Sequence, residues 1–166
     1  MSNIGQTVLN PKWQAGTSMK ALVWHGKRDV RVETHGIPDL TDPGDELVRV
    51  TCATVCGSDL HLYNGCAFEL KSGDILGHEC AGVVEKVGPE VSGVKVGDRV
   101  VVTAVIACGQ CKWCEQGLTS ACSETNTSSA MEKLYGTTFS GIFGYGHITG
   151  GYPGGQAGRV SECFDG

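Results

Sequence analysis

The chain has 166 residues, 13 of them basic and 18 acidic, so its formal net charge is −5. This length suits one domain rather than two, and 40% hydrophobic residues are enough for a packed core. The mild negative charge, without a basic cluster, argues against nucleic acid as a partner. No apolar run reaches the roughly 18 residues that a membrane span needs. The 25 glycines indicate many tight turns or close backbone approaches.

The nine cysteines are the most informative part of the composition. An odd number would leave one thiol over in a fully paired disulfide framework. Residues 1–18 contain no Arg and no apolar run, so they resemble neither a secretory signal nor a transit peptide. We therefore expect the chain in the cytoplasm, where clustered cysteines bind metal more often than they form disulfides.

Short runs rich in β-branched residues, separated by turns, dominate the chain from Met19 onwards, whereas residues 1–18 are predicted to form a loose extension. This alternation is typical of an antiparallel β-barrel or sandwich, and no βαβ pattern points to a parallel sheet. The expected elements are strands at 21–24, 30–33, 47–55, 81–87 and 99–106, and a helix at 59–63 capped by Ser58.

The pattern weakens after residue 119. Eight glycines crowd between residues 141 and 158, and this Gly-rich end is expected to be irregular. We predict extended loop from 119 to 166, with a helix only at 130–134.

Four cysteines lie close together with the spacing C-x2-C-x2-C-x7-C: Cys108, Cys111, Cys114 and Cys122. Four thiolates suit a structural zinc ion, which prefers a closed tetrahedron of sulfur or nitrogen ligands. The alternatives are a redox-active pair, two disulfides or an iron–sulfur cluster. Redox motifs normally begin a helix beside a βαβ pattern, and the spacing matches no recognised cluster motif. The sequence therefore favours a zinc lobe.

A second group of metal-ligand types surrounds Cys56 and His78. Cys56 follows an apolar run, and His78 precedes another within Gly-His-Glu. A catalytic zinc uses about three protein ligands and keeps one position open. We predict Cys56 and His78 as ligands, with Asp59 accepting the other ring N–H of His78 and Glu79 beside the metal.

Ser58 and His61 are residue types that pass a proton from a metal-bound hydroxyl to solvent. Each of these residues alone also has a structural interpretation, since a lone Cys is often a small core residue and a lone His is often a hydrogen-bonded structural group. The hypothesis therefore depends on the whole group. The remaining residues of these types are expected to have structural roles. Cys52, Cys66 and Cys80 should be core or loop thiols, and His25, His35 and His147 should be surface or loop groups. Trp13, Trp24 and Trp113 should serve packing.

The segment Gly77-His78-Glu79-x2-Gly82-x5-Gly88-x2-Val91 matches the signature of zinc-containing medium-chain alcohol dehydrogenases, and Cys56-Gly57-Ser58-Asp59-x-His61 and the four-cysteine segment follow the same order and spacing. The chain resembles that family from about Met19 to Ala157. The resemblance implies a GroES-like β-barrel over 19–157, Cys56 and His78 as catalytic zinc ligands, and a proton relay through Ser58 and His61. Residues 150–157 resemble the branch that includes formaldehyde-dehydrogenase-like enzymes.

The chain departs from this family after Ala157. Members continue into a third catalytic zinc ligand, a dinucleotide-binding Rossmann domain and a tail that completes the barrel. No G-x-G-x-x-G lies between a strand and a helix here. Residues 158–166 are an atypical tail, and Cys163 comes too early to be the third ligand. We expect a fragment with no NAD(P) site of its own, inactive alone.

Three functions compete. The first is the zinc-binding catalytic portion of an NAD(P)-dependent alcohol or aldehyde dehydrogenase, acting on a small alcohol or aldehyde. The second is a non-catalytic, zinc-stabilised GroES-like interaction module. The third is a metal-storing thiol protein, which core-forming strands and a cysteine content of about 5% disfavour. An incomplete barrel would also expose apolar strand surface, so self-association into a homo-oligomer is expected.

Overall fold

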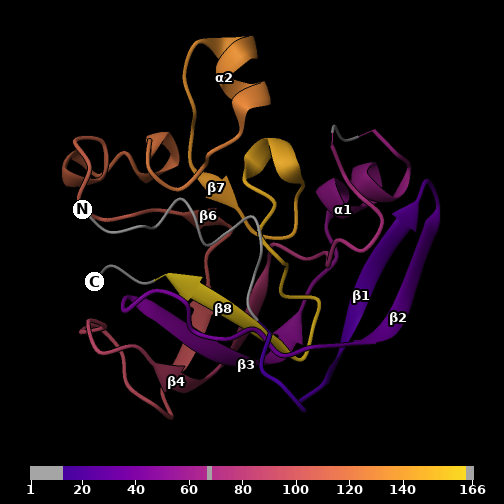
Figure 1. Ribbon diagram of the computed structural model, residues 1–166, viewed down its shortest axis with the longest axis horizontal. Helices are drawn as coiled ribbons and strands as arrows, with labels where there is room; N and C mark the ends of the chain where they lie inside the picture. Colours follow the sequence, from indigo (N-terminus) through magenta and orange to yellow (C-terminus); the bar gives the residue numbers. More distant parts are fainter. Residues whose placement is uncertain (1–12, 67–68, 164–166) are drawn as a thin grey trace.

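The computed structural model describes residues 13–66 and 69–163, and its regular structure is mainly β (Figure 1). Its strands are β1 (Met19–Gly26), β2 (Asp29–His35), β3 (Asp45–Ala53), β4 (Cys80–Val87), β5 (Arg99–Val102), β6 (Val105–Ile106), β7 (Gly141–Ile142) and β8 (Arg159–Cys163). Its helices are α1 (Gly57–Tyr63) and α2 (Ser129–Tyr135), with short 3-10 turns η1 (Cys114–Gln116), η2 (Thr119–Ala121) and η3 (His147–Thr149).

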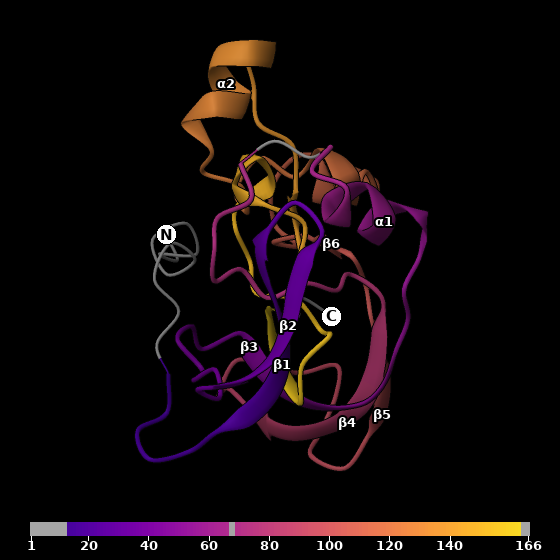
Figure 2. The same cartoon turned by 90° about the vertical axis from the view of Figure 1, so that its right-hand side faces the viewer.

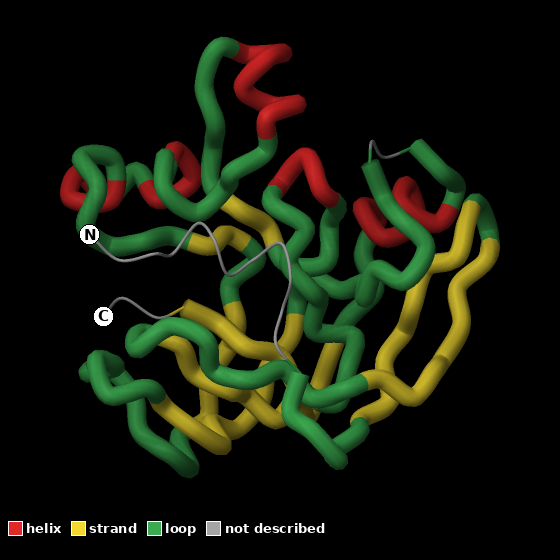
Figure 3. The backbone as a smooth tube through the Cα atoms, in the orientation of Figure 1, coloured by secondary structure: helices red, strands yellow, loops and turns green. Residues whose placement is uncertain are grey.

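The strands form three antiparallel sheets. β1 and β2 form a hairpin, β6 pairs with β7, and the largest sheet has the order β5-β4-β3-β8. The hairpin stands beside the large sheet, and α2 projects from the end of the molecule that is opposite the large sheet (Figures 1 and 2). The large sheet lies in the lower part of the view in Figure 3, and the helices and 3-10 turns lie above it.

β3 lies between two hydrophobic cores because successive side chains of a strand point to opposite faces. Leu47 packs with the inward residues of β1, and Val48 packs with residues of β4, β5 and β8. The first core contains Met19, Ala21, Val23, Ile37, Leu47, Ile75 and Ala157. The second contains Val48, Cys80, Val84, Val102, Ile106, Phe143 and Val160.

Trp13, which precedes the first strand, also contacts the core. Trp13 forms an isolated bridge with Pro38, and its ring lies 4.4 Å from that of His35 and packs against the first core. Packing was the role expected for this tryptophan, and Gln14 is also anchored, by hydrogen bonds to Ile37 and Pro38, whereas residues 15–18 are exposed. Residues 1–12 of the predicted loose extension lie outside the described residues.

The C-terminal part contains a strand where the sequence predicted loop. β8 pairs with β3 from Asp45↔Cys163 to Arg49↔Arg159, and Val160 is 2% exposed in the second core. The expected atypical tail thus supplies the outer strand of the main sheet. The sequence signal was weak because one buried residue gives no visible alternation, and pairing with a neighbouring strand decides such cases. Residues 164–166 lie outside the described part.

Smaller corrections concern single elements. The strand expected at 99–106 is split, because β5 pairs with β4 whereas β6 turns to pair with β7. The Thr103 hydroxyl, at the break, donates to the backbone oxygen of Val105 at 2.7 Å. The helix expected at 130–134 is confirmed as α2. Over the residues described, no helix has the length and apolar character needed to cross a membrane.

Candidate metal centres

The four-cysteine lobe follows β6, where η1 and η2 fold the chain back on itself. The four sulfur atoms all lie within 4.8 Å of one another, with Cys111 Sγ at 3.6 Å from Cys114 Sγ and 4.0 Å from Cys122 Sγ. A disulfide would need about 2.05 Å. Four sulfurs around one zinc at about 2.3 Å would be about 3.8 Å apart. The donor set and its spacing therefore fit a tetrahedral zinc ion.

Local backbone geometry builds this lobe. Gly109 and Gly117 have φ of +69° and +74°, which lets the chain turn sharply between the cysteines. The amide of Cys111 donates to Cys108 Sγ at 3.3 Å, and the amide of Cys108 donates to Cys122 Sγ at 3.4 Å. Amides directed at sulfur stabilise thiolates, the form in which cysteine binds metal.

Cys108, Cys111 and Cys114 have shifted pKa values when no metal is bound. Burial raises the pKa of Cys108 to about 12 and also raises that of Cys114. Burial would raise the pKa of Cys111 too, but the amides of Cys114, Ser123 and Trp113 outweigh it and lower the pKa to about 6. Cys111 is therefore ionised more readily than Cys108 and Cys114, and metal binding must displace protons from those two thiols.

Cys56, Asp59 and His78 form the second group, with ligand atoms that lie within 4.8 Å of one another. Cys56 Sγ is 3.2 Å from His78 Nε2. Around a shared zinc, these two atoms would be about 3.6 Å apart. On the other side of the ring, His78 Nδ1 is 3.7 Å from Asp59 Oδ1 and has no hydrogen-bond partner among the described residues. Sγ and Nε2 are thus the donors that face each other, and Asp59 lies behind the imidazole.

The start of α1 positions Cys56. Cys56 is the N-cap of this helix: its sulfur accepts from the Ser58 amide at 3.3 Å, and its own amide donates to Asp59 Oδ2 at 2.8 Å. The predicted capping residue, Ser58, is therefore wrong. Sulfur is outside the oxygen-bearing set of usual caps. The reciprocal cap orients Cys56 and Asp59 together.

His78 sits just before β4, with only 9% of its side chain exposed. The Tyr145 ring packs edge-on against it at 5.6 Å between centroids. The next residue, Glu79, is exposed, and its carboxylate accepts from the Thr54 hydroxyl. The structure thus places Glu79 beside the group but directs its carboxylate toward Thr54.

Ser58 and His61 lie one turn apart on α1, where residues three apart share a face. Ser58, two residues after Cys56, is half-buried, and His61 is exposed. Cys80 is buried in the second core and Cys66 lies in a loop, as expected, whereas Cys52 is exposed on β3 and belongs to neither class.

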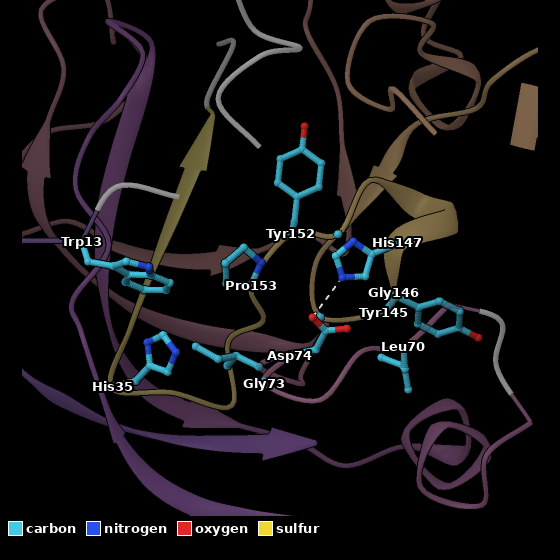
Figure 4. Close-up of a pocket in the computed structure, with 13 residues that line it drawn as sticks. Trp13, His35, Leu70, Gly73, Asp74, Tyr145, Gly146, His147, Tyr152 and Pro153 are labelled. Atoms are coloured by element: carbon cyan, nitrogen blue, oxygen red, sulfur yellow. Dashed lines mark hydrogen bonds and ion pairs between the residues drawn. The ribbon is translucent and has the colours of Figure 1, made fainter. Parts of the chain in front are cut away.

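A pocket of about 250 Å³ lies behind Tyr145 (Figure 4). His147 and Asp74 form an ion pair in its wall, with Nε2 and Oδ1 3.1 Å apart, and His35 and Trp13 lie on the other side. Tyr145 lines this pocket and also packs on His78, so it contacts both the pocket and the second metal-ligand group. His35 and His147 are half-buried pocket residues rather than free surface groups.

Sequence reasoning missed two residues that contact the second group, Tyr145 and Gln156, and also Thr54, which holds the neighbouring Glu79. The Gly-rich segment around Gln156 was noticed, but its glycines indicated only irregular backbone. The close approach of Gly154 and Gly155 to residues 76–80 is the physical reason for them, since a Cβ on Gly155 would lie 2.3 Å from Cys80 Sγ. No local pattern in the sequence identifies these contacts.

Comparison with known proteins gives a consistent result. The model of the alcohol dehydrogenase GroES-like domain matches residues 42–159. A zinc-type alcohol dehydrogenase-like protein of Schizosaccharomyces pombe is 42% identical over 151 residues, which are 90% of this chain and 36% of that protein.

Two solved structures extend the likeness to the fold. The alcohol dehydrogenase TADH from Thermus sp. ATN1 has a TM-score of 0.76 and 38% identity, covering 88% of this chain and 38% of that one. A cobalt- and zinc-bound thermostable alcohol dehydrogenase from Pyrobaculum aerophilum has a TM-score of 0.67 and 30% identity, covering 89% and 39%. The chain spans about a third of the length of such relatives. With its mainly β fold and matching residues 42–159, the chain belongs to the alcohol dehydrogenase GroES-like domain family.

Proposed function

We propose that this chain is the zinc-binding catalytic portion of an NAD(P)-dependent alcohol or aldehyde dehydrogenase. The observation that carries the proposal is the convergence of Cys56 Sγ and His78 Nε2, 3.2 Å apart, with the Asp59 carboxylate behind the imidazole. The four-cysteine lobe holds a structural zinc in this proposal. No disulfide joins the cysteines that the structure describes, as is expected in a reducing cytoplasm.

Cys56 and His78 provide two of the ligands of a catalytic zinc. The Asp59 carboxylate, whose Oδ1 lies 3.7 Å from Nδ1, favours the proton on that nitrogen by its charge, which leaves the Nε2 lone pair for the metal. Zinc, when bound, supplies Lewis acidity toward the oxygen of a small alcohol or aldehyde. A nicotinamide cofactor supplies the hydride acceptor, which requires a dinucleotide-binding unit joined to this domain.

Ser58 and His61 handle the proton in this proposal. The Ser58 hydroxyl takes the proton of the substrate hydroxyl and gives its own to His61, which releases it to solvent from its exposed position on α1. Glu79 supplies negative charge beside the ligand pair while its carboxylate is held by Thr54. Ser58, His61 and Glu79 are therefore the residues assigned to catalysis.

The test uses the 166-residue chain alone and fused to the dinucleotide-binding domain of a family member. Absorbance of NAD(P)H, with short alcohols and aldehydes, measures turnover. The fusion should be active, and the chain alone should be inactive, because losing the positioning of two reactants removes an effective molarity on the order of 10⁵ M.

A matched pair of variants assigns any activity to the site. His78→Ala in the fusion should abolish turnover, whereas His25→Ala, a change at a histidine paired with Glu33 away from the site, should not. Zinc-dependent turnover by the chain alone would refute the proposal. A folded, zinc-loaded but inactive fusion would favour a non-catalytic, zinc-stabilised module.

We also propose that the domain self-associates through strand edges. Val101 on β5 and Val32 on β2 are 79% and 69% exposed, and among the described strands β5 pairs only with β4. Sedimentation of the wild type and Val101→Lys tests this, because the variant should shift toward monomer. A variant that associates as strongly as the wild type, or a wild type that is purely monomeric, would contradict the proposal.

A further inference from the structure

Gln156 connects the segments on both sides of the second metal-ligand group. Its amide nitrogen Nε2 donates to the backbone oxygen of Thr54 at 2.9 Å and to Asp59 Oδ1 at 3.2 Å. Thr54 lies two residues before Cys56, and Asp59 is the carboxylate that accepts from the Cys56 amide. One side chain, about 100 residues away in the sequence, therefore holds both the loop before α1 and its first turn.

The same residue fits closely against the segment that carries His78. Gly77 has φ of +107°, and a Cβ there would lie 2.4 Å from the backbone nitrogen of Gln156 and 2.5 Å from its side-chain Cγ. The backbone N–H of Gln156 donates to the backbone oxygen of Leu76 at 2.9 Å, and the backbone carbonyl of Gln156 accepts from the Leu22 amide at 2.8 Å. The backbone of Gln156 is therefore anchored on two sides, and its side chain starts from a fixed point.

The chemistry of its partners fixes the orientation of the Gln156 amide. The Thr54 carbonyl and the Asp59 carboxylate are acceptors only, so the NH₂ end must face them. This leaves Gln156 Oε1 buried without a hydrogen-bond partner among the described residues. Such an arrangement is unfavourable and persists only where the surroundings dictate it. The side-chain NH₂ of Gln156, which donates to Thr54 and Asp59, is thus the group that matters for the second metal-ligand group.

We propose that Gln156 is a positioning residue for the metal centre at Cys56 and His78. It holds Asp59 where the carboxylate faces His78 Nδ1, and it fixes the loop that presents the Cys56 sulfur. None of its polar contacts is with Cys56 Sγ or His78 Nε2, so it acts through Asp59 and the backbone. The inference rests on the proposed function, because it requires that this pair binds a metal.

Two substitutions separate the donor from the volume of the side chain. Gln156→Met keeps the length and removes the donor. Gln156→Glu directs an oxygen at two acceptors and repels Asp59. Gln14 provides a matched control, since its Nε2 also donates to a backbone oxygen, that of Pro38, at 3.0 Å. Gln14→Met and Gln14→Glu should leave both metal centres unchanged.

Cobalt(II) is the probe, because its sulfur-to-metal absorption reports each centre and the four-thiolate lobe absorbs more strongly than a centre with one thiolate. Titration against a chelator gives each affinity, and thermal unfolding confirms that each variant is folded. Removing partners of metal ligands typically lowers metal affinity by about 10- to 100-fold. We expect about tenfold weaker cobalt binding for Gln156→Met, about 100-fold for Gln156→Glu, and a shifted absorption band in both.

The outcomes are distinguishable. If the wild type binds a second cobalt and both Gln156 variants keep its affinity within twofold and its band position, the positioning role is wrong while the proposed function survives. If the wild type binds cobalt only at the four-cysteine lobe, both are wrong. If the lobe changes in parallel with the second centre, the effect is global and the positioning role is again contradicted.

Discussion

The two metal-ligand groups are built in opposite ways. In the four-cysteine lobe, all ligands come from residues 108–122, and local turns and amides direct the sulfurs. In the second group, Cys56 and His78 come from separate segments and are held by contacts that reach Gln156. A local site depends on its own sequence, whereas a site assembled from distant segments depends on the whole fold. Substitutions in the four-cysteine lobe and substitutions around the second group should therefore affect metal binding differently.

Cys111→Ser should have the largest effect. A structural zinc contributes its binding free energy to folding, on the order of 10 kcal/mol for small zinc domains. The variant should lose about one zinc per chain by elemental analysis and unfold at a lower temperature. Cys66→Ser, at an exposed thiol outside both groups, is the control. An unchanged zinc content in Cys111→Ser would show that the lobe is not a metal site.

Gly77→Ala should affect the second group only. The new Cβ would overlap the backbone nitrogen of Gln156 at 2.4 Å, and the φ of residue 77 is +107°, which favours glycine. Overpacking and left-handed strain together cost about 3 kcal/mol. Urea unfolding should show this loss, and metal analysis should show zinc in the lobe alone. Gly57→Ala, where a Cβ meets no atom within 4 Å, should be neutral. Loss of both metals from Gly77→Ala would indicate that the sites are not independent.

Chelation should sharpen the same contrast. Four thiolates hold zinc more tightly than Cys56 and His78, two protein ligands with open positions. We expect a mild chelator to remove the second zinc at a concentration at least about 100-fold lower, a difference of about 2.7 kcal/mol. Release can be followed with a zinc-sensitive dye in wild type and Cys111→Ser. Simultaneous release of both ions would contradict this ranking.

Glu46→Gln should have the smallest effect, and it concerns the scaffold. Glu46 is fully buried in β3, both its carboxylate oxygens lack a partner among the described residues, and burial raises its pKa above the ordinary value of 4.5. The unfolded chain therefore loses this proton first as pH rises, so the free energy of unfolding falls from about pH 4.5 up to the raised folded-state pKa. Removing the charge should stabilise the domain by about 1 kcal/mol at pH 7.

Denaturant unfolding between pH 4 and 8 measures this difference. The fall in stability with rising pH should be smaller in Glu46→Gln but not absent, because burial also raises the pKa of Asp45. A variant that is less stable than wild type at pH 7 would show that the carboxylate has a favourable role.

The contrast between the two groups also explains what the sequence could predict. The four-cysteine lobe was predictable because its ligands are close in sequence, and the types at Cys56, Asp59 and His78 form recognisable local patterns. The contacts of Gln156 were not predictable, because no periodicity links it to Asp59, 97 residues earlier. β8 was missed for a related reason: its strand conformation comes from pairing with β3.

Cadmium-113 NMR of the cadmium-substituted chain tests the central claim, that one domain holds two metal centres with different donor sets. The wild type should give two resonances, one from four sulfurs and one from a mixed sulfur–nitrogen centre. Cys111→Ser should remove the first, and His78→Ala should remove or shift the second while leaving the first unchanged. A single four-sulfur resonance in the wild type, unaltered by His78→Ala, would contradict the account.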